Sequence, residues 1–287
     1  MFQGIVQVLF DGIAFGMLLF VMSVGLSITL GMMKFANLAH GVFAMLGGYV
    51  CTVLMHRAGW PFLATLPAAF IIVAVASVFL ERFVYRRMYA AKELDQVLLT
   101  VGIIYMAIAA AAYVWGPEPQ AFALPDYLTM YRHIGSFSFS TYGALLLVLG
   151  TIITLAIFYG LERTRFGAMI RAAVDDRRVA LGVGININRV FTITFAIGSG
   201  LAGLGGALGI NTLGLDPSFP IEYLVFFLIV VSIGGGGTVK GALAAALLLG
   251  LSDTAGKYYV PQTGAFIIYA VMLVVMLWRP NGLFGRT

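Results

Sequence analysis

Long apolar runs, each near the length that a helix needs to cross a bilayer, recur along this chain of 287 residues. They occupy residues 5–30, 62–84, 96–115, 141–161, 190–213 and 264–278. A spanning helix needs about 20 apolar residues, because no water in the hydrocarbon core satisfies an exposed backbone. Charged residues make up only 10% of the chain, whereas about 25% is typical of soluble domains. The sequence therefore predicts a multi-pass helical membrane protein.

Two further apolar regions are interrupted by polar stretches that contain glycine. The first interruption, residues 31–41, contains Asn37, His40 and Gly41, and the second, residues 234–241, begins with four consecutive glycines. Glycine-interrupted segments in both halves of a transporter point to internal repeats around a central substrate path. We therefore expect the two interruptions to approach each other, or a partner permease, near the central axis.

Three shorter apolar segments adjoin the interruptions and decide the number of crossings. They occupy residues 42–55, 222–233 and 242–252. Depending on how they are counted, the chain crosses the membrane eight or nine times. The predicted fold is all-α, a polytopic transmembrane helical bundle with two interrupted segments, in a single domain over residues 1–287.

Basic residues are concentrated in particular loops, which predicts the orientation of the chain. The loop 162–189 lies between two long apolar runs and holds six arginines. Residues 81–92 and 279–287 are also basic. Lys and Arg mark cytoplasmic loops, so these three segments are expected inside and the poorly basic loop 116–140 outside. The net charge of +5 is therefore a topology signal, and the chain has no base-reading motif that would indicate nucleic acid as a partner.

Within the loop 162–189, small residues recur at four-residue spacing. If the segment is one helix, these residues form a single row on its surface: Ala168, Ala172, Asp176, Ala180 and Gly184. Asp175 or Asp176 can instead cap a second short helix that begins at Arg177. Either arrangement offers a close-approach face to a cytoplasmic partner. The alternative is a solvated loop whose arginines only set the topology.

The polar residues of the two interruptions each admit two interpretations. His40, ionisable at membrane depth, either contacts substrate or is hydrogen-bonded within the bundle. Asn37 either presents its amide to a polar substrate or caps the helix that follows. The four glycines, Gly234, Gly235, Gly236 and Gly237, either leave unwound backbone along a substrate path or let helices pack closely.

The chain carries no recognisable catalytic apparatus. It has no Walker A motif, no nucleophile elbow and no spacing typical of metal ligands. Cys51 is the only cysteine, which excludes an intramolecular disulfide and a cysteine-based metal site. We therefore expect no catalytic residue, no metal site and no cofactor in this chain.

The pattern F-G-x-x-x-R-A-x-x-x-D-x-x-x-A-x-x-x-G-I-N, at residues 166–186, resembles the cytoplasmic loop of LivH-type permeases from branched-chain amino acid ABC importers. Four other motifs agree with the family and follow its order along nearly the whole chain. They are F-A-N-L-A-H-G at 35–41, E-R-F-V-Y-R-R at 81–87, G-G-G-G-T-V-K-G at 234–241 and R-P-N-G-L-F-G-R at 279–286. The first and third depart slightly from the usual family pattern, and both lie where substrate would pass.

The resemblance implies roles for two sets of residues. In the family, the cytoplasmic loop holds the coupling helix that docks on an ATPase subunit. The expected coupling residues are Arg171, Ala172, Asp175, Asp176, Ala180 and Gly184. The expected substrate-path residues are Asn37, His40, Gly41, Gly234, Gly235, Gly236 and Gly237.

The resemblance also implies an assembly in the bacterial inner membrane. Its other members would be a second, LivM-like permease, two cytoplasmic ATPases that bind ATP and Mg²⁺, and a periplasmic substrate-binding protein. The expected cargo is a branched-chain or related small amino acid, and the alternatives are urea and other amides or aromatic and dicarboxylic acids. A stand-alone secondary transporter is a further alternative. It would require intramembrane carboxylates for ion coupling, whereas the acidic residues here lie mostly at span ends.

Overall fold

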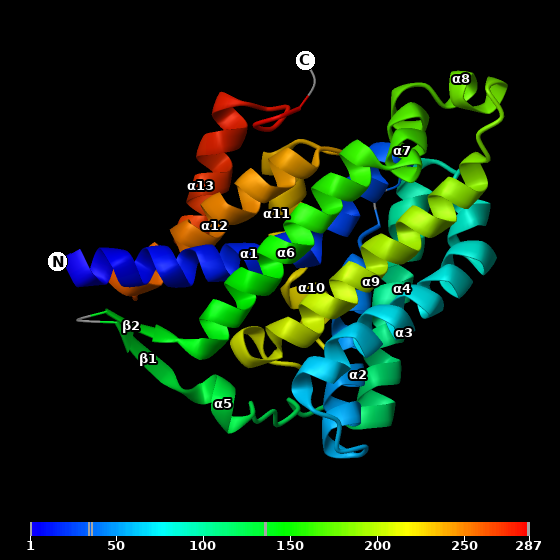
Figure 1. Cartoon of the computed structure of the whole chain (residues 1–287). Helices are drawn as coiled ribbons and strands as arrows, with labels where there is room; N and C mark the ends of the chain where they lie inside the picture. Colours follow the sequence, from blue (N-terminus) through cyan, green and yellow to red (C-terminus); the bar gives the residue numbers. More distant parts are fainter. Residues whose placement is uncertain (1, 34, 36, 135–136, 286–287) are drawn as a thin grey trace.

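A computed structural model describes residues 2–33, 35, 37–134 and 137–285, and helices form nearly all of it (Figure 1). Ala36 and Arg286, which belong to two of the family motifs, lie outside the described residues. The helices of the first half are α1 (Phe2–Met33), α2 (His40–His56), α3 (Phe62–Phe83), the 3₁₀ turn η1 (Tyr85–Met88), α4 (Glu93–Trp115) and α5 (Asp126–Thr129). Strands β1 (Tyr131–Ile134) and β2 (Phe137–Ser140) follow. The second half contains α6 (Thr141–Arg163), α7 (Arg165–Asp175), α8 (Arg177–Gly182), α9 (Ile187–Leu213), α10 (Phe219–Glu222), α11 (Leu224–Gly234), α12 (Val239–Tyr259) and α13 (Gly264–Trp278).

The predicted helical bundle is confirmed. Six helices in the described part of the chain are long and apolar enough to cross a membrane, namely α1, α3, α4, α6, α9 and α12. Three shorter apolar helices lie at His40–His56, Phe219–Gly234 and Phe266–Trp278. The chain is therefore a multi-pass membrane protein.

Helix α12 is longer than its apolar run predicts. The expected outer connection from residue 253 onward is wrong, because the helix continues to Tyr259. Asp253 is buried within the helix, and its carboxylate lies 2.7 Å from the Lys257 ammonium one turn later. Such a pair at i and i+4 lets two charged residues remain helical.

Helices α1 and α9 form the centre of the bundle, and α4 and α6 lie at its periphery. The most apolar stretches of α1 and α9 are 72% and 78% buried, against 17% for α4 and α6. Glycines on α9 permit this close packing: a Cβ atom at Gly206 would lie 1.9 Å from the Ala44 carbonyl oxygen on α2. Small residues at helix contacts are typical of packing in a membrane, where dispersion forces replace the hydrophobic effect.

The loop expected at the outer end contains a short helix and a hairpin. Strands β1 and β2 pair in antiparallel register from Tyr131 opposite Ser140 to Ile134 opposite Phe137. The Phe139 ring lies 5.6 Å from that of Phe10 on α1, so the hairpin rests against the first half of α1. Alternation of Phe and Ser along β2 is typical of a strand with one packed face.

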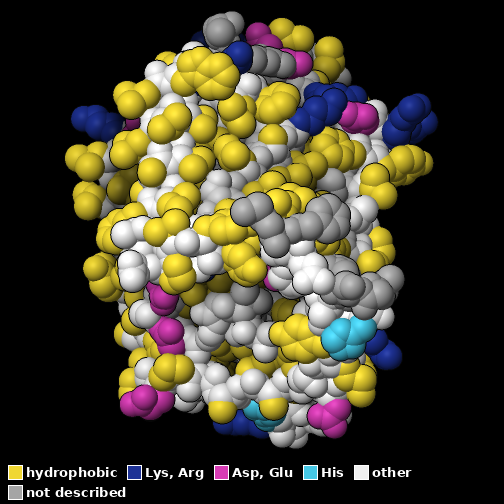
Figure 2. All heavy atoms as spheres, turned by 90° about the vertical axis from the view of Figure 1, so that its left-hand side faces the viewer, with side chains coloured by type: hydrophobic (Ala, Val, Ile, Leu, Met, Phe, Trp, Pro, Cys, Tyr) yellow, Lys and Arg dark blue, Asp and Glu magenta, His cyan; other side chains and the backbone are white. Residues whose placement is uncertain are grey.

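The two ends of the bundle differ in charge. Helices α7 and α8 lie at the upper right of Figure 1, and the hairpin with α5 lies at the lower left. Figure 2 shows a face covered largely by hydrophobic side chains, with most of the Lys and Arg side chains gathered near its upper edge. This distribution agrees with a cytoplasmic α7–α8 end.

We expect Lys92 and Arg171 to be cytoplasmic and Asp126 and Tyr258 to be outside. All four are exposed, so a cysteine at each position would react with a membrane-impermeant thiol reagent from one side only. The measurement uses a Cys51→Ala background, which removes the buried native thiol on α2. Labelling of position 171 from the periplasm would contradict this orientation. Arg286 is also predicted to be cytoplasmic, but it lies outside the described residues.

Candidate functional site

The loop after α6 reverses the chain sharply and begins a new helix. Thr164 is the N-cap of α7, and its hydroxyl accepts a hydrogen bond from the Gly167 amide at 3.0 Å. A Cβ atom at Gly167 would lie 2.2 Å from the Leu161 carbonyl oxygen, so only glycine fits at this reversal. These local interactions place α7 against the end of α1 and the start of α9.

Helix α8 is a separate short helix with a defined beginning and end. The Asp176 carboxylate accepts hydrogen bonds from the amides of Arg178 at 2.7 Å and Val179 at 3.1 Å, which is an N-cap. At the other end, the Gly184 amide bonds the Leu181 carbonyl and the Ile185 amide bonds the Ala180 carbonyl. With Gly184 at φ +86°, these bonds form a Schellman motif.

Of the two arrangements that the sequence allows, the structure has the second, in which Asp176 caps a helix beginning at Arg177. The small residues therefore do not form one continuous row. Ala180 is buried at 2% exposure, whereas Gly184 is exposed beyond the end of α8. Ala172 is half-buried on α7.

The exposed face of α8 is apolar, a feature that the small-residue pattern does not reveal. Val179, Leu181 and Val183 have exposed fractions of 63%, 54% and 71%. We call these three residues the α8 apolar patch. In the sequence these three apolar residues follow Arg177 and Arg178. Apolar side chains in a charged loop indicate a contact surface, because a solvated loop gains nothing from exposing them.

A small core ties the α7–α8 region to the end of α1. Ile170 and Ala173 of α7 and Ala180 of α8 are buried with Met32, which lies in the last turn of α1. Ile187, Val190 and Phe191 at the start of α9 complete this core. A displacement of α7 and α8 would therefore act directly on the helix end that precedes the first interruption.

The first interruption lies in packed surroundings. Asn37 is buried, accepts a hydrogen bond from the Tyr85 hydroxyl at 3.1 Å, and leaves its Nδ2 without a partner among the described residues. His40 opens α2, and its Nε2 lies 2.8 Å from the Met22 carbonyl oxygen. A Cβ atom at Gly41 would lie 3.0 Å from Pro220, so α2 begins in close contact with α10.

The second interruption is narrower than predicted and spans residues 235–238, between α11 and α12. Gly235 and Gly237 adopt φ of +85° and +88°. A Cβ atom at Gly234 would lie 2.6 Å from Gly241, and one at Gly237 would lie 2.7 Å from the Gly31 Cα. At Gly236 the nearest atom to such a Cβ would be Leu30 Cδ2 at 3.5 Å, which is ordinary contact.

The C-terminal segment caps the broken end of α11, an interaction that the sequence motif alone does not reveal. The Leu283 amide donates to the Ile233 carbonyl at 2.7 Å, and the Phe284 amide donates to the Gly234 carbonyl at 3.3 Å. The break is thus held by backbone hydrogen bonds, as polar backbone groups buried in a membrane protein require.

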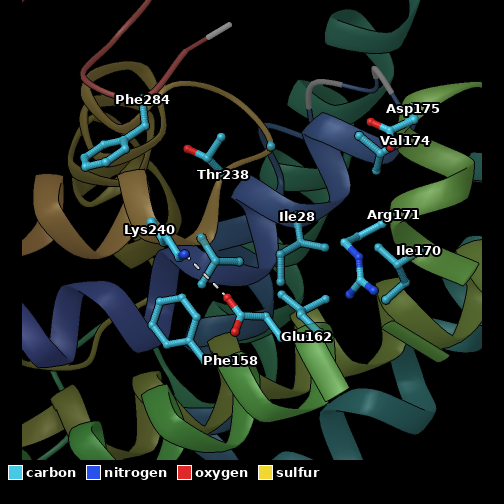
Figure 3. A pocket seen from close by; sticks show the side chains of 13 residues that line it. Ile28, Phe158, Glu162, Ile170, Arg171, Val174, Asp175, Thr238, Lys240 and Phe284 are labelled. Atoms are coloured by element: carbon cyan, nitrogen blue, oxygen red, sulfur yellow. Dashed lines mark ion pairs between the residues drawn. The ribbon is translucent and has the colours of Figure 1, made fainter. Parts of the chain in front are cut away.

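Two cavities at the α7 end of the bundle are lined by both the second interruption and α7. One, of about 340 Å³, is lined by Gly237 and Lys240 as well as Glu162, Arg171 and Asp175. Figure 3 shows Arg171 and Asp175 on the α7 side and the Lys240–Glu162 ion pair on the other. The ammonium and carboxylate of that exposed pair are 3.5 Å apart, a geometry that contributes at most about 1 kcal/mol.

The second cavity, of about 410 Å³, is lined by Gly31 and Gly236 together with Asn281 and Gly285. Val174, Gly237 and Thr238 line both cavities. Arg171 and Asp175 therefore face the cavity next to the second interruption, and the α8 apolar patch is the part of the loop that faces outward. The described residues contain no cluster of three or more His, Cys, Asp or Glu side chains that could hold a metal ion.

Comparison with known proteins shows the family of the chain. A family model described as the branched-chain amino acid transport system permease component matches residues 8–276. The chain belongs to this permease family. It is 26% identical to the high-affinity branched-chain amino acid transport permease LivH of Escherichia coli (strain K12), over 98% of this chain and 95% of LivH.

Two further relatives extend the comparison within the family. The permease BraD of Pseudomonas aeruginosa is 25% identical, over 98% of this chain and 95% of BraD. The permease LivM of Escherichia coli (strain K12) is also 25% identical, over 94% of this chain and 68% of LivM. The family is thus one of transport permeases, and the chain is similar to both LivH and LivM.

Proposed function

We propose that this chain is the membrane-spanning permease subunit of a bacterial ABC importer for branched-chain or related small amino acids in the inner membrane. The match of residues 8–276 to the permease family carries this proposal. LivH and BraD, two relatives that the chain matches nearly end to end, are permeases of high-affinity branched-chain amino acid transport systems. In this proposal, ATP and Mg²⁺ bind to partner ATPases, and this chain holds no cofactor.

The expected partners are a second permease, two cytoplasmic ATPases and a periplasmic binding protein. Similarity to LivM as well as LivH supports a pair of related permeases around one path. The binding protein supplies specificity, so few residues of this chain need to contact the cargo.

We propose that α7 and α8 couple the permease to an ATPase. The α8 apolar patch is exposed, and Arg178 beside it is exposed as well. An apolar centre with a polar rim is the usual composition of a protein interface. Movement of α8 would reach the first interruption through Met32 and the second through Val174. Of the expected coupling residues, Arg171 and Asp175 act on the cavity side of α7 in this proposal.

We propose that the cargo passes the second interruption at Gly236. Its glycine neighbours make close backbone contacts, and Gly236 itself lines the 410 Å³ cavity. Unwound backbone offers N–H and C=O groups to a zwitterion without a fixed charge that would hold it. Asn37, His40 and Gly41 stay candidates for the path in a conformation that opens the packing around α2.

Reconstitution tests the proposal directly. The chain, co-expressed with its LivM-like and ATPase partners, is placed in liposomes with the binding protein, and uptake of labelled leucine is measured. We expect uptake to require ATP on the ATPase side and to stop in an ATPase variant that cannot hydrolyse ATP. Leucine uptake by this chain alone, driven by an ion gradient, would contradict the proposal and indicate a secondary transporter.

A further inference from the structure

Three arginines from two distant parts of the sequence line a cavity at the cytoplasmic end of the bundle. Arg82 closes α3, Arg86 lies in η1, and Arg189 lies in the first turn of α9. The cavity has a volume of about 490 Å³, and Asn186, Asn188 and Thr192 add polar groups to its wall. Its composition suits an anion that carries several acceptor oxygens.

No carboxylate among the described residues forms an ion pair with these arginines. The nearest acidic residue in sequence, Glu81, is fully buried behind the cavity wall, and its carboxylate is bonded to hydroxyl groups, one of them from the wall residue Thr192. It accepts hydrogen bonds from the Tyr89 hydroxyl at 2.9 Å and the Thr192 hydroxyl at 2.8 Å. The guanidinium groups of the cavity therefore keep their hydrogen-bonding capacity for a ligand.

An apolar groove lies farther along α9. It has a volume of about 390 Å³ and is lined mainly by α6 and α9, with Ile28 of α1, Phe70 of α3 and two residues of α7 completing it. Its side chains are nearly all apolar, among them Ile153, Ile157, Ile197 and Leu201. Phe70 precedes Arg82 on α3, and Ile197 and Leu201 follow Arg189 on α9. Ile193 lines the arginine cavity and Ile197, one turn later, lines the groove, and both are exposed on α9. We call the arginine cavity and the adjoining groove together the cleft.

One row of α9 connects the two parts. Arg189, Ile193, Ile197 and Leu201 follow one another at four-residue spacing, which places them on one helix face. Arg189 and Ile193 line the arginine cavity, whereas Ile197 and Leu201 line the groove. At 1.5 Å per residue the row is about 18 Å long, close to the roughly 15 Å that one leaflet of the hydrocarbon core measures.

We propose that this cleft binds an anionic phospholipid of the cytoplasmic leaflet. The phosphate lies among Arg82, Arg86 and Arg189, and one acyl chain lies along Ile193, Ile197 and Leu201. Exposed apolar side chains flank the arginines: Phe79 and Phe83 on α3 are 60% and 63% exposed, and Ile193 is 47% exposed. A site where guanidinium groups meet exposed apolar surface is a membrane interface, and basic pockets between helices on the cytoplasmic side suit acidic headgroups.

A protein partner is the competing occupant of the cleft, and the exposure and lining of the two surfaces argue against it. The α8 apolar patch, with its adjoining Arg178, projects beyond the bundle and is the more suitable docking face. The arginine cavity is instead followed along α9 by a groove whose side chains are nearly all apolar, which suits an acyl chain. The arginine cavity shares no lining residue with the two cavities beside the second interruption, and the inference does not depend on which solute the chain transports.

Native mass spectrometry of the full chain tests the proposal. The purified protein is incubated with equal amounts of dioleoyl-phosphatidylglycerol and dioleoyl-phosphatidylcholine, and retained lipid is counted. We expect phosphatidylglycerol to be retained at least tenfold better. The double variant Arg82→Gln/Arg189→Gln is expected to lose that preference, and Ile197→Trp, which fills the groove, is expected to lower it at least threefold with the arginines intact.

The double variant Arg163→Gln/Arg165→Gln is the matched control. It removes two positive charges at the same end of the bundle and changes no residue that lines the cleft, so its preference is expected to equal that of the native chain. An equal loss in this control would show a general surface-charge effect and overturn the proposal. Displacement of the bound lipid by inorganic phosphate would indicate a simple anion site. Unchanged lipid retention with reduced ATPase recovery in the cleft variant would indicate a protein interface.

Discussion

Replacing Gly236 by leucine is expected to reduce substrate uptake to background while the assembled complex is recovered in normal amount. Gly236 lines the 410 Å³ cavity next to α7, and a Cβ atom there would lie 3.5 Å from its nearest neighbour. A leucine side chain therefore fits without forcing the backbone apart, but it projects into the path that we propose for the cargo. Uptake by liposomes and the yield of purified complex are the two measurements.

The same substitution one residue later is expected to have a different effect. Gly237 has φ +88°, and its Cβ atom would lie 2.7 Å from the Gly31 Cα. A side chain in the left-handed region costs about 1–2 kcal/mol, and overpacking adds about 1–3 kcal/mol. These losses are a large fraction of the roughly 5–15 kcal/mol by which folded domains are stable. We expect Gly237→Leu to lower the yield of folded chain as well as uptake.

Gly102→Leu is the control for a leucine added to a transmembrane segment. Gly102 is exposed on α4, and a Cβ atom there meets nothing within 4 Å. Its uptake and yield are expected to be normal. Normal uptake by Gly236→Leu would remove the cavity from the proposed path, and loss of complex in that variant would assign Gly236 to packing instead.

Introducing charge into the α8 apolar patch is expected to separate the permease from its ATPase. In a Leu181→Asp/Val183→Asp variant, two side chains with exposed fractions of 54% and 71% become carboxylates. If they lie at the centre of the docking interface, their loss weakens binding by about 2 kcal/mol or more, which is at least about tenfold. We expect the ATPase to be lost on co-purification while membrane insertion is unchanged.

Val260→Asp is the matched control for this variant. Val260 is 46% exposed at the far end of α12, beyond reach of a cytoplasmic partner in the proposed orientation. It is expected to co-purify with the ATPase as the native chain does. Full ATPase recovery by the Leu181→Asp/Val183→Asp variant would show that the patch is not the docking face.

Substitutions of Asp176 separate the effect of its negative charge from the effect of its hydrogen bonds as the N-cap of α8. Its carboxylate caps α8 through the amides of Arg178 and Val179. Asp176→Asn keeps a capping oxygen and is expected to retain most ATPase binding, whereas Asp176→Ala loses about 1 kcal/mol of helix stability and is expected to bind more weakly. Equal weakening by Asp176→Asn and Asp176→Ala would show that the charge, and not the cap, matters.

The helical bundle was predictable because each span needs a long apolar run, and that requirement can be counted in a sequence. The arginines of the loop 162–189 can be counted in the same way, and the cytoplasmic side that they indicate stays a prediction. The end of α12 was not predictable from apolarity, since the Asp253–Lys257 pair keeps two charged residues helical. The hairpin at residues 131–140 was missed because it forms outside the apolar runs.

The candidate site was likewise predictable from the sequence only in part. Residue types alone identified the two interruptions and the α7–α8 region, because glycines and charges are conspicuous in a membrane sequence. Only the tertiary structure separates Gly236, which lines a cavity, from Gly234 and Gly237, which touch backbone. It likewise places Ala180 in a core and Val183 on the surface. Local composition determines which segments cross the membrane, but contacts between residues far apart in the chain determine which side chains face a cavity, a partner or another helix.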